Sequence, residues 1–159
     1  MALTDLVLLV LLCTALVFSI IELGLSADAV DLSIGASVAH DRFSFVVFCS
    51  VWTLLLASFF IFFPYFSSRR DTERLMAPLT IALNAVTMIF WLAGFAAVAD
   101  LFGGGNPQGV AGALLAFAVM LWLLFLAILI LNILTATGVL RSERMGHSRL
   151  TTGKPAATV

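Results

Sequence analysis

Hydrophobic residues fill four long stretches of the chain, and polar residues gather in the segments between them. A helix needs roughly 20 apolar residues to cross a hydrocarbon core about 30 Å thick, and each stretch reaches that length. The pattern predicts transmembrane helices over residues 3–25, 43–66, 76–101 and 110–140, followed by a polar, basic tail over residues 141–159. We therefore expect an all-α integral membrane protein with a bundle of four transmembrane helices.

The first stretch has a second interpretation, because its end, "GLSA", resembles the small-residue cleavage site of a secretory signal peptide. The residues before the apolar run contain Asp5 and no Lys or Arg, whereas a signal peptide begins with positive charge. The run from Leu6 to Ile21 is also at or beyond the long end of a signal-peptide core. We therefore interpret this stretch as a transmembrane helix.

Composition supports a membrane protein and gives no sign of a nucleic-acid partner. Of the 159 residues, 62% are hydrophobic and 11% are charged, whereas soluble domains are about half apolar and about a quarter charged. The formal net charge is -1, without the clustered basic face by which nucleic-acid-binding proteins are recognised.

The basic residues predict which side of the membrane each segment faces. Seven of the eight lie between the second and third stretches or in the tail: Arg69, Arg70, Arg74, Arg141, Arg144, Arg149 and Lys154. Cytoplasmic loops retain Lys and Arg, so we expect both chain termini in the cytoplasm. The six arginines of this set are also expected to bind anionic lipid headgroups, at about 1 kcal/mol for each charge near the surface. Arg42 is predicted to lie in an outer connection over residues 26–42, whose segment "DAVDLSIGASV" forms either a short interfacial helix or a loose cover.

Two carboxylates fall at membrane depth, where ionisable groups are costly and by default indicate function or pairing. Glu22 lies about one turn inside the outer end of the first predicted span, and Asp100 ends the third span on the same side. No Lys or Arg lies within the predicted spans to neutralise them. Two interpretations remain open: each acid contacts interfacial water or caps a backbone group, or the pair shares a proton or binds a cation or polar ligand.

At helical spacing, each acid shares a face of its helix with small residues. On the first span these are Ala15, Ser19 and Ser26, and on the third span they are Ala82, Ala85, Ala93, Ala96 and Ala97. Because small side chains let membrane helices approach closely, we expect both stripes to pack inside the bundle. The same reasoning places Ser50, Thr53 and Ala57 of the second span inside the bundle.

Two asparagines are predicted to join the third and fourth spans. Asn84 and Asn132 lie at similar inward depths of spans that a short Gly-rich loop makes neighbours. We expect an interhelical hydrogen bond between them, worth roughly 0.6 kcal/mol. Asn84 also shares a face with Thr87, Met88, Trp91 and Phe95, opposite the alanine stripe, which conflicts with a single packed face. Two alternatives remain open: the third span is buried on both sides, or it offers one side to sterol, lipid or another subunit.

Cysteine and histidine residues indicate no redox or metal centre. Cys13 and Cys49 fall inside predicted spans and form no Cys-x-x-Cys motif, and His40 and His147 are predicted on opposite sides of the membrane. We expect no cofactor and no metal.

Three segments resemble known sequences: "FVVFCSVWTLLLASFFIFFPYF", "LLAFAVMLWLLFLAILIL" and, most specifically, "TMIFWLAGFAAVAD". They are similar to the helices of fungal MARVEL-domain proteins, of the non-classical export and eisosome-associated branch, along nearly the whole chain up to about Leu140. The resemblance implies four membrane helices with short cytoplasmic ends, and no catalytic motif. Many relatives carry cysteines in the loop before the fourth helix, and "GGGNPQG" here has none.

The resemblance also implies a role in organising membrane microdomains or in vesicle trafficking, without catalysis. The implied partners are membrane lipids, sterol among them, with homo-oligomers or other membrane proteins as further partners. The implied location is the plasma membrane or a secretory-pathway or vesicle membrane. The alternatives are a small membrane enzyme of isomerase or cyclase type, using Glu22 and Asp100 in a fungal biosynthetic pathway, or a transport or channel subunit.

Overall fold

Four long helices make up nearly all of the part of the chain that can be described. The computed structural model describes residues 3–66, 70–103, 105, 107–137 and 139, of which 63–66 and 70–77 are described by their backbone alone. The helices are α1 (Leu3–Leu32), α2 (Ser37–Phe66), α3 (Arg70–Leu101) and α4 (Val110–Ala136). All four are long and apolar enough to cross a membrane, which confirms the predicted fold class.

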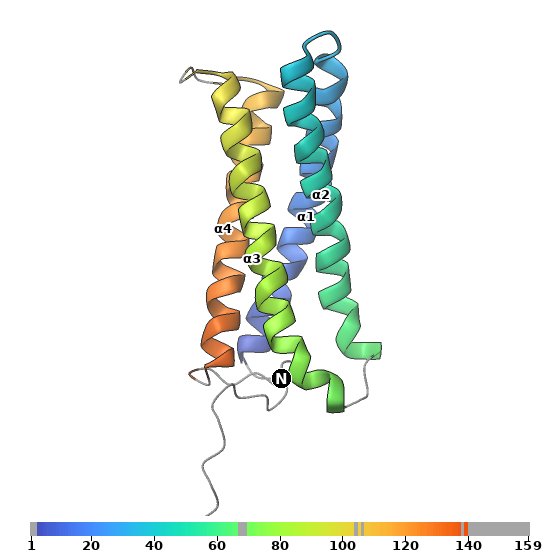
Figure 1. The fold of residues 1–159 in the computed structure, drawn as a ribbon, viewed down its shortest axis with the longest axis vertical. Helices are drawn as coiled ribbons and strands as arrows, with labels where there is room; N and C mark the ends of the chain where they lie inside the picture. The colour runs from blue at the N-terminus through green and yellow to red at the C-terminus, as the bar shows by residue number, and fades with distance from the viewer. Residues whose placement is uncertain (1–2, 67–69, 104, 106, 138, 140–159) are drawn as a thin grey trace, which may run out of the picture.

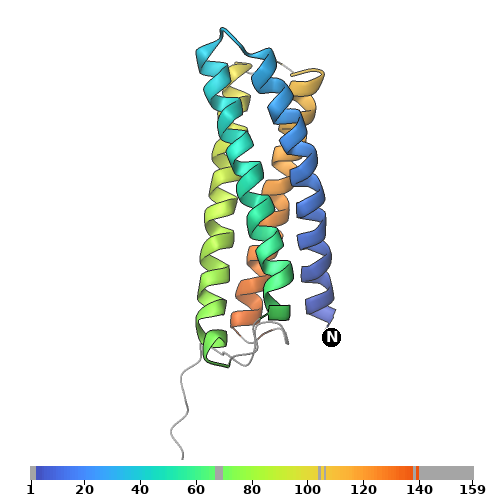
Figure 2. The same ribbon diagram turned by 90° about the vertical axis from the view of Figure 1, so that its right-hand side faces the viewer.

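The helices run up and down side by side, so that each is antiparallel to the next in the chain (Figures 1 and 2). Helix α1 packs against α2 and α4, and α3 packs against the same two helices. The bundle is therefore a ring in which α1 lies diagonally opposite α3. The α1–α2 and α3–α4 connections lie at one end, which we call the loop end (Figure 1).

Helices α1 and α2 are longer than the sequence pattern predicted. Each has 30 residues, which is about 45 Å at 1.5 Å per residue. The predicted outer connection over residues 26–42 is therefore wrong: most of it is helical, and residues 33–36 form the turn. Gly35 has a φ of 98°, a left-handed conformation that glycine adopts at little cost. Helix formation continues beyond the apolar run because hydrophobicity marks the membrane core and not the end of the helix.

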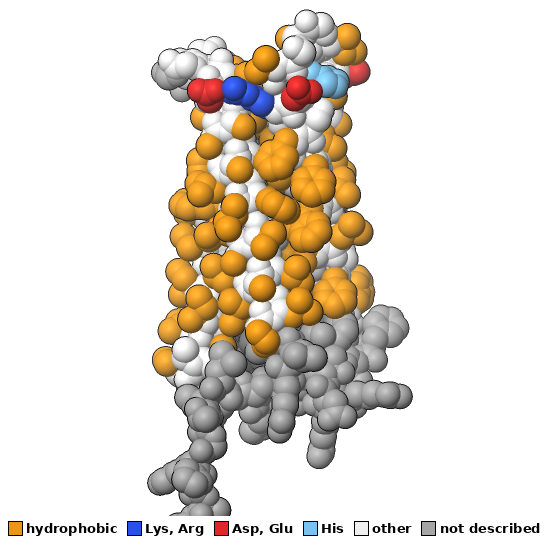
Figure 3. Space-filling model, viewed as in Figure 1, with side chains coloured by type: hydrophobic (Ala, Val, Ile, Leu, Met, Phe, Trp, Pro, Cys, Tyr) orange, Lys and Arg blue, Asp and Glu red, His pale blue; other side chains and the backbone are white. Residues whose placement is uncertain are grey.

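The bundle core follows a seven-residue repeat along α1 and α4. On α1 the buried positions alternate by three and four residues: Asp5, Leu8, Leu12, Ala15, Ser19, Glu22, Ser26 and Ala29. Helix α4 does the same from Leu114 to Asn132. This spacing is typical of helices that wrap around each other with a left-handed twist. The outward positions are also apolar (Figure 3), as expected for helices surrounded by lipid.

Candidate functional site

Glu22 lies in the interior of the bundle. Its side chain is 0% exposed, on the stripe with Ala15, Ser19 and Ser26, and the predicted burial of this stripe is confirmed. Because α1 continues to Leu32, Glu22 lies about three turns from the helix end, not one.

No hydrogen-bond partner reaches either carboxylate oxygen of Glu22 within the described residues. The neighbouring hydroxyls on α1 are already used: Ser19 donates to the Leu16 carbonyl at 2.9 Å, and Ser26 donates to the Leu23 carbonyl at 3.2 Å. A buried carboxyl group without a partner is costly, so Glu22 is the least satisfied polar group of α1 in the structure.

Asp100 is in a different setting, at the surface of the loop end. Its side chain is 73% exposed, and Oδ2 lies 2.7 Å from Nη1 of Arg42 on α2. The same Arg42 nitrogen donates a hydrogen bond to the Ala97 carbonyl at 2.7 Å. Figure 3 shows the charged side chains in a band near this end. The expectation that no basic residue could neutralise the acids is wrong for Asp100, because α2 begins at Ser37 and places Arg42 inside the helix.

The structure therefore does not bring Glu22 and Asp100 together. Glu22 is fully buried inside the bundle, whereas Asp100 is exposed and paired with Arg42. The expectation that both acids point inward holds for Glu22 and is wrong for Asp100. The paired arrangement of Glu22 and Asp100 that the sequence left open is therefore not formed.

Asn84 and Asn132 are both buried, but the hydrogen bond predicted between them is not formed. Neither side-chain atom of Asn84 has a partner among the described residues, and the Asn132 amide nitrogen has none either. The prediction matched the two residues by depth alone. Depth does not decide whether two side chains on adjacent helices point at one another.

The alanine stripe of α3 does not face the core. Ala82, Ala93 and Ala96 are exposed, and Ala85 and Ala97 are only half-buried. The buried face of α3 carries instead Asn84, Thr87, Trp91, Gly94 and Val98. The expected packing role inside the bundle is therefore wrong for this stripe. In lipid, small apolar side chains can face outward as readily as large ones, so residue size alone did not determine the inward side.

Two reciprocal Trp–Thr hydrogen bonds join α2 and α3. The Trp91 indole N–H of α3 donates to the Thr53 hydroxyl oxygen of α2 at 2.9 Å, and both side chains are fully buried. The Trp52 indole N–H of α2 donates to the Thr87 hydroxyl oxygen of α3 at 3.0 Å. Sequence reasoning missed both pairs. A usable signal was present, because a buried indole N–H usually finds an acceptor and both threonines lie at helical spacing on the facing helices.

Close packing and aromatic contacts surround these bonds. A Cβ at Gly94 of α3 would lie 3.8 Å from Val46 Cγ2 and 3.9 Å from Cys49 Sγ, in ordinary van der Waals contact, so α2 and α3 pack closely here. On the same seam Phe90 makes edge-to-face contacts with Phe45, Phe48 and Trp52, with ring centroids 5.7 to 6.4 Å apart. The predicted inward stripe of α2, Ser50, Thr53 and Ala57, is fully buried, which confirms it.

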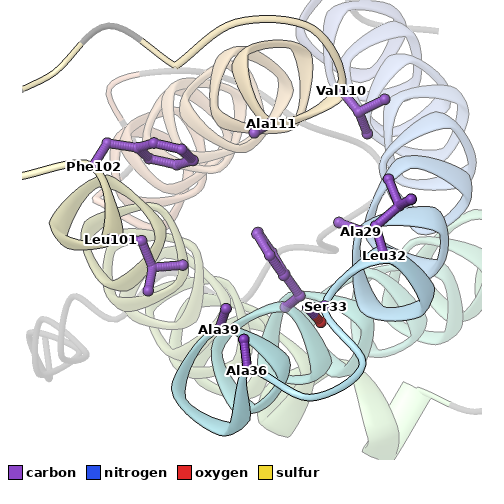
Figure 4. A pocket seen from close by; sticks show the side chains of 10 residues that line it. Ala29, Leu32, Ser33, Ala36, Ala39, Leu101, Phe102, Val110 and Ala111 are labelled. Carbon is purple, nitrogen blue, oxygen red and sulfur yellow. The ribbon is translucent and has the colours of Figure 1, made fainter.

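A cavity of about 420 Å³ opens at the loop end, where all four helices contribute to its lining. Figure 4 looks into it and shows Ala29 and Leu32 of α1, Leu101 of α3 and Ala111 of α4 around the opening. The described lining is almost entirely apolar, so the cavity suits an apolar group and offers no side chains for acid–base chemistry.

The remaining predicted site residues add no chemistry that the structure can place. Arg69, Arg141, Arg144 and Arg149 lie outside the described residues, and Arg70 and Arg74 are described only by their backbone in α3. The described residues contain no group of three or more His, Cys, Asp or Glu side chains that could hold a metal ion.

Together these features define an integral membrane protein of four antiparallel helices. The chain matches the MARVEL membrane-associating domain over residues 5–131, a range that includes most or all of each helix, and it belongs to that family. No curated protein and no solved structure gives a significant match to the chain.

Proposed function

We propose that this protein organises membrane microdomains or takes part in vesicle trafficking, and that it does so without catalysis. The observation that carries the proposal is the match to a membrane-associating domain across all four helices. The geometry supports it, because Glu22 and Asp100, the acids of the enzyme alternative, are apart and the large cavity is apolar.

The outer surface supports interaction with lipid along the length of the bundle (Figure 3). Large apolar side chains are exposed on every helix, including Ile20 of α1, Phe62 of α2, Ile89 of α3 and Leu123 of α4. The outward alanine stripe of α3 adds a place where a helix of a second copy, or of another membrane protein, can approach closely. Lipids, sterol among them, are the proposed partners, together with such helices.

The sidedness of the chain and its membrane are part of the proposal. The arginines near the α2–α3 connection and in the tail favour cytoplasmic termini, which places the loop end on the opposite side of the membrane. We propose the plasma membrane or a secretory-pathway or vesicle membrane as the location. The resemblance of "TMIFWLAGFAAVAD" to the fungal export and eisosome-associated branch supports a fungal setting.

Localisation in a fungal cell, with and without sterol depletion, tests this function. A fluorescently tagged copy is expected to gather in discrete membrane domains, and sterol depletion is expected to disperse it. An unrelated four-helix membrane protein with the same tag controls for general effects of depletion on the membrane. A uniform distribution that does not respond to sterol would contradict the proposal.

A separate double variant, Glu22→Gln with Asp100→Asn, tests the enzyme alternative. Because the two side chains are not together, the variant is expected to localise like the original chain and to leave the phenotype unchanged between external pH 4 and 7, a range that begins near the ordinary carboxyl pKa of about 4 and extends above it. A lost phenotype with normal localisation would instead favour acid-dependent chemistry.

A further inference from the structure

The loop-end cavity has the volume of a small-molecule site. Its volume is about 420 Å³, and binding sites for small molecules commonly range from about 300 to 1,000 Å³. It is bounded by the ends of all four helices, and small residues such as Ala36, Ala39 and Ala111 leave the space that larger side chains would fill (Figure 4). A guest would therefore contact every helix of the bundle at once.

The lining determines what the buried part of a guest must be. Among the described residues that line it, Ser33 is the one with a polar side chain, and the Ser33 hydroxyl already donates to the Val30 carbonyl at 2.8 Å. Phe43, Leu101 and Phe102 supply large apolar surfaces. A polar group placed inside would lose its hydrogen bonds to water and gain few in return, so the buried part is apolar.

The charges at the loop end favour a positive charge on the part that stays outside. Four exposed acids, each one or two residues from a lining residue in the sequence, are Asp28, Asp31, Asp41 and Asp100. Arg42 is the basic side chain among the described residues there, so the formal charge is four negative and one positive, or -3 with His40 neutral. A net charge of one sign beside a low-dielectric cavity raises the local concentration of opposite charge.

We propose that the loop-end cavity binds a cationic amphiphile, with its apolar tail among the helix ends and its positive head at the acidic mouth. An anionic amphiphile would be repelled by the same charges. A second copy docking end to end would bring another net charge of -3 to the contact and would be repelled as well. This ligand site goes beyond the proposed role in membrane organisation, and its test on purified protein does not depend on localisation.

Photo-labelling with three probes of equal tail length tests the proposal. Dodecyltrimethylammonium, dodecanol and dodecyl sulfate, each with a diazirine near the end of the tail, are added at submicellar concentration to the full chain in phosphatidylcholine nanodiscs. The cationic probe is expected to label peptides that contain Leu101, Phe102 or Val110. Its binding should exceed that of dodecanol roughly 5- to 10-fold, as estimated for a charge of -3 at about 10 Å in water.

Variants that change charge test the binding of the positive head, and variants that fill the cavity test the binding of the apolar tail. Asp28→Asn with Asp31→Asn removes two charges and should weaken binding of the cationic probe about 4-fold, while dodecanol changes little. Ala111→Leu fills the cavity from α4, and Ala39→Leu fills it from α2; both should reduce labelling by the cationic probe and by dodecanol. Ala27→Leu is the matched control, because Ala27 is exposed on α1 and should leave labelling unchanged.

Several results would overturn the proposal. Equal binding of the cationic and sulfate probes would show that the cavity does not select by charge. Labelling spread evenly over the outward helix faces would show that the probes have no specific site at the loop end. Unchanged labelling in both cavity-filling variants would do the same. Circular dichroism of each variant in the nanodiscs establishes that it is folded, and two filling variants on different helices keep the test decisive if one of them fails to fold.

Discussion

A buried acid of α1 carries an unexplained energetic cost in this bundle. Glu22 is 0% exposed, and neither carboxylate oxygen has a partner among the described residues. Leaving a buried polar group unsatisfied costs about 1–3 kcal/mol, and more if the group is charged. The unpaired carboxyl group therefore makes Glu22 the first residue at which to test the stability of the bundle.

Replacing Glu22 by Met is therefore expected to stabilise the protein. Met is similar in length and has no strong hydrogen-bonding group, so the free energy of unfolding should rise by about 1–3 kcal/mol. Thermal unfolding in detergent micelles, followed by circular dichroism, measures the change. Glu22→Gln is the control, because it keeps an unpaired polar group and should gain less. A lower melting temperature for Glu22→Met would show that the carboxyl group has a stabilising partner.

The Trp91–Thr53 hydrogen bond is expected to stabilise the α2–α3 contact measurably. Thr53→Val keeps the shape of the side chain but leaves the Trp91 N–H unpaired in the core, and should cost about 1–3 kcal/mol. In a double-mutant cycle, Thr53→Val and Trp91→Phe should couple by about 0.6–1.7 kcal/mol, from the average to the maximum measured for hydrogen bonds between membrane helices.

Trp122 of α4 provides the matched control for that cycle. Its indole N–H has no partner among the described residues, so Trp122→Phe should show almost no coupling to Thr53→Val. Equal coupling for the two tryptophans would mean that the effect comes from ring volume and not from the hydrogen bond.

Among the four helices, α3 differs most in side-chain composition between its inward and outward faces. Its inward face carries Asn84, Thr87, Trp91 and Val98 around Gly94, and its outward face carries the alanine stripe. The inward polar groups and the close approach at Gly94 hold α3 against α2, whereas the alanines meet lipid or another chain. Neighbouring positions on this helix should therefore respond very differently to the same substitution.

Substitution by leucine at Gly94 and at Ala93 is expected to show this difference. Gly94→Leu extends a side chain past a Cβ already 3.8 Å from Val46, so overpacking should destabilise the bundle by about 1–3 kcal/mol or more. Ala93→Leu adds a side chain on the outward face and should change stability by less than about 0.5 kcal/mol. Denaturation in mild detergent measures both. A large loss for Ala93→Leu would place that face in a contact that stabilises the fold.

For the whole molecule, the bundle has its acidic loop end at one side and the arginine-rich α2–α3 connection at the other. Because cytoplasmic segments retain Lys and Arg, this asymmetry predicts one orientation in the membrane. The apolar cavity and the Arg42–Asp100 pair then lie on the side opposite the cytoplasm.

Cysteine labelling in intact cells tests that orientation. The starting chain has Cys13 and Cys49 replaced by Ala and is located in the plasma membrane. A cysteine introduced at Ala36 in the α1–α2 turn should then react with a membrane-impermeant maleimide added to the outside of the cells. A cysteine at Ser148 in the tail should react only after the membrane is permeabilised. The reverse pattern would contradict cytoplasmic termini.

The sequence by itself determined the class of the molecule, because hydrophobic length and helical period are properties of single segments. Four spans, the inward stripes on α1 and α2, and the family resemblance all follow from local pattern, and the structure agrees with them.

Only the tertiary structure decided which side chains meet. Asp100 pairs with Arg42 and not with Glu22, Asn84 lacks its predicted partner, and the alanines of α3 point outward. The physical reason is that lipid removes the distinction between inside and outside on which hydrophobic patterning depends. Partner choice then depends on how each helix is rotated and shifted against its neighbours, which no single segment encodes.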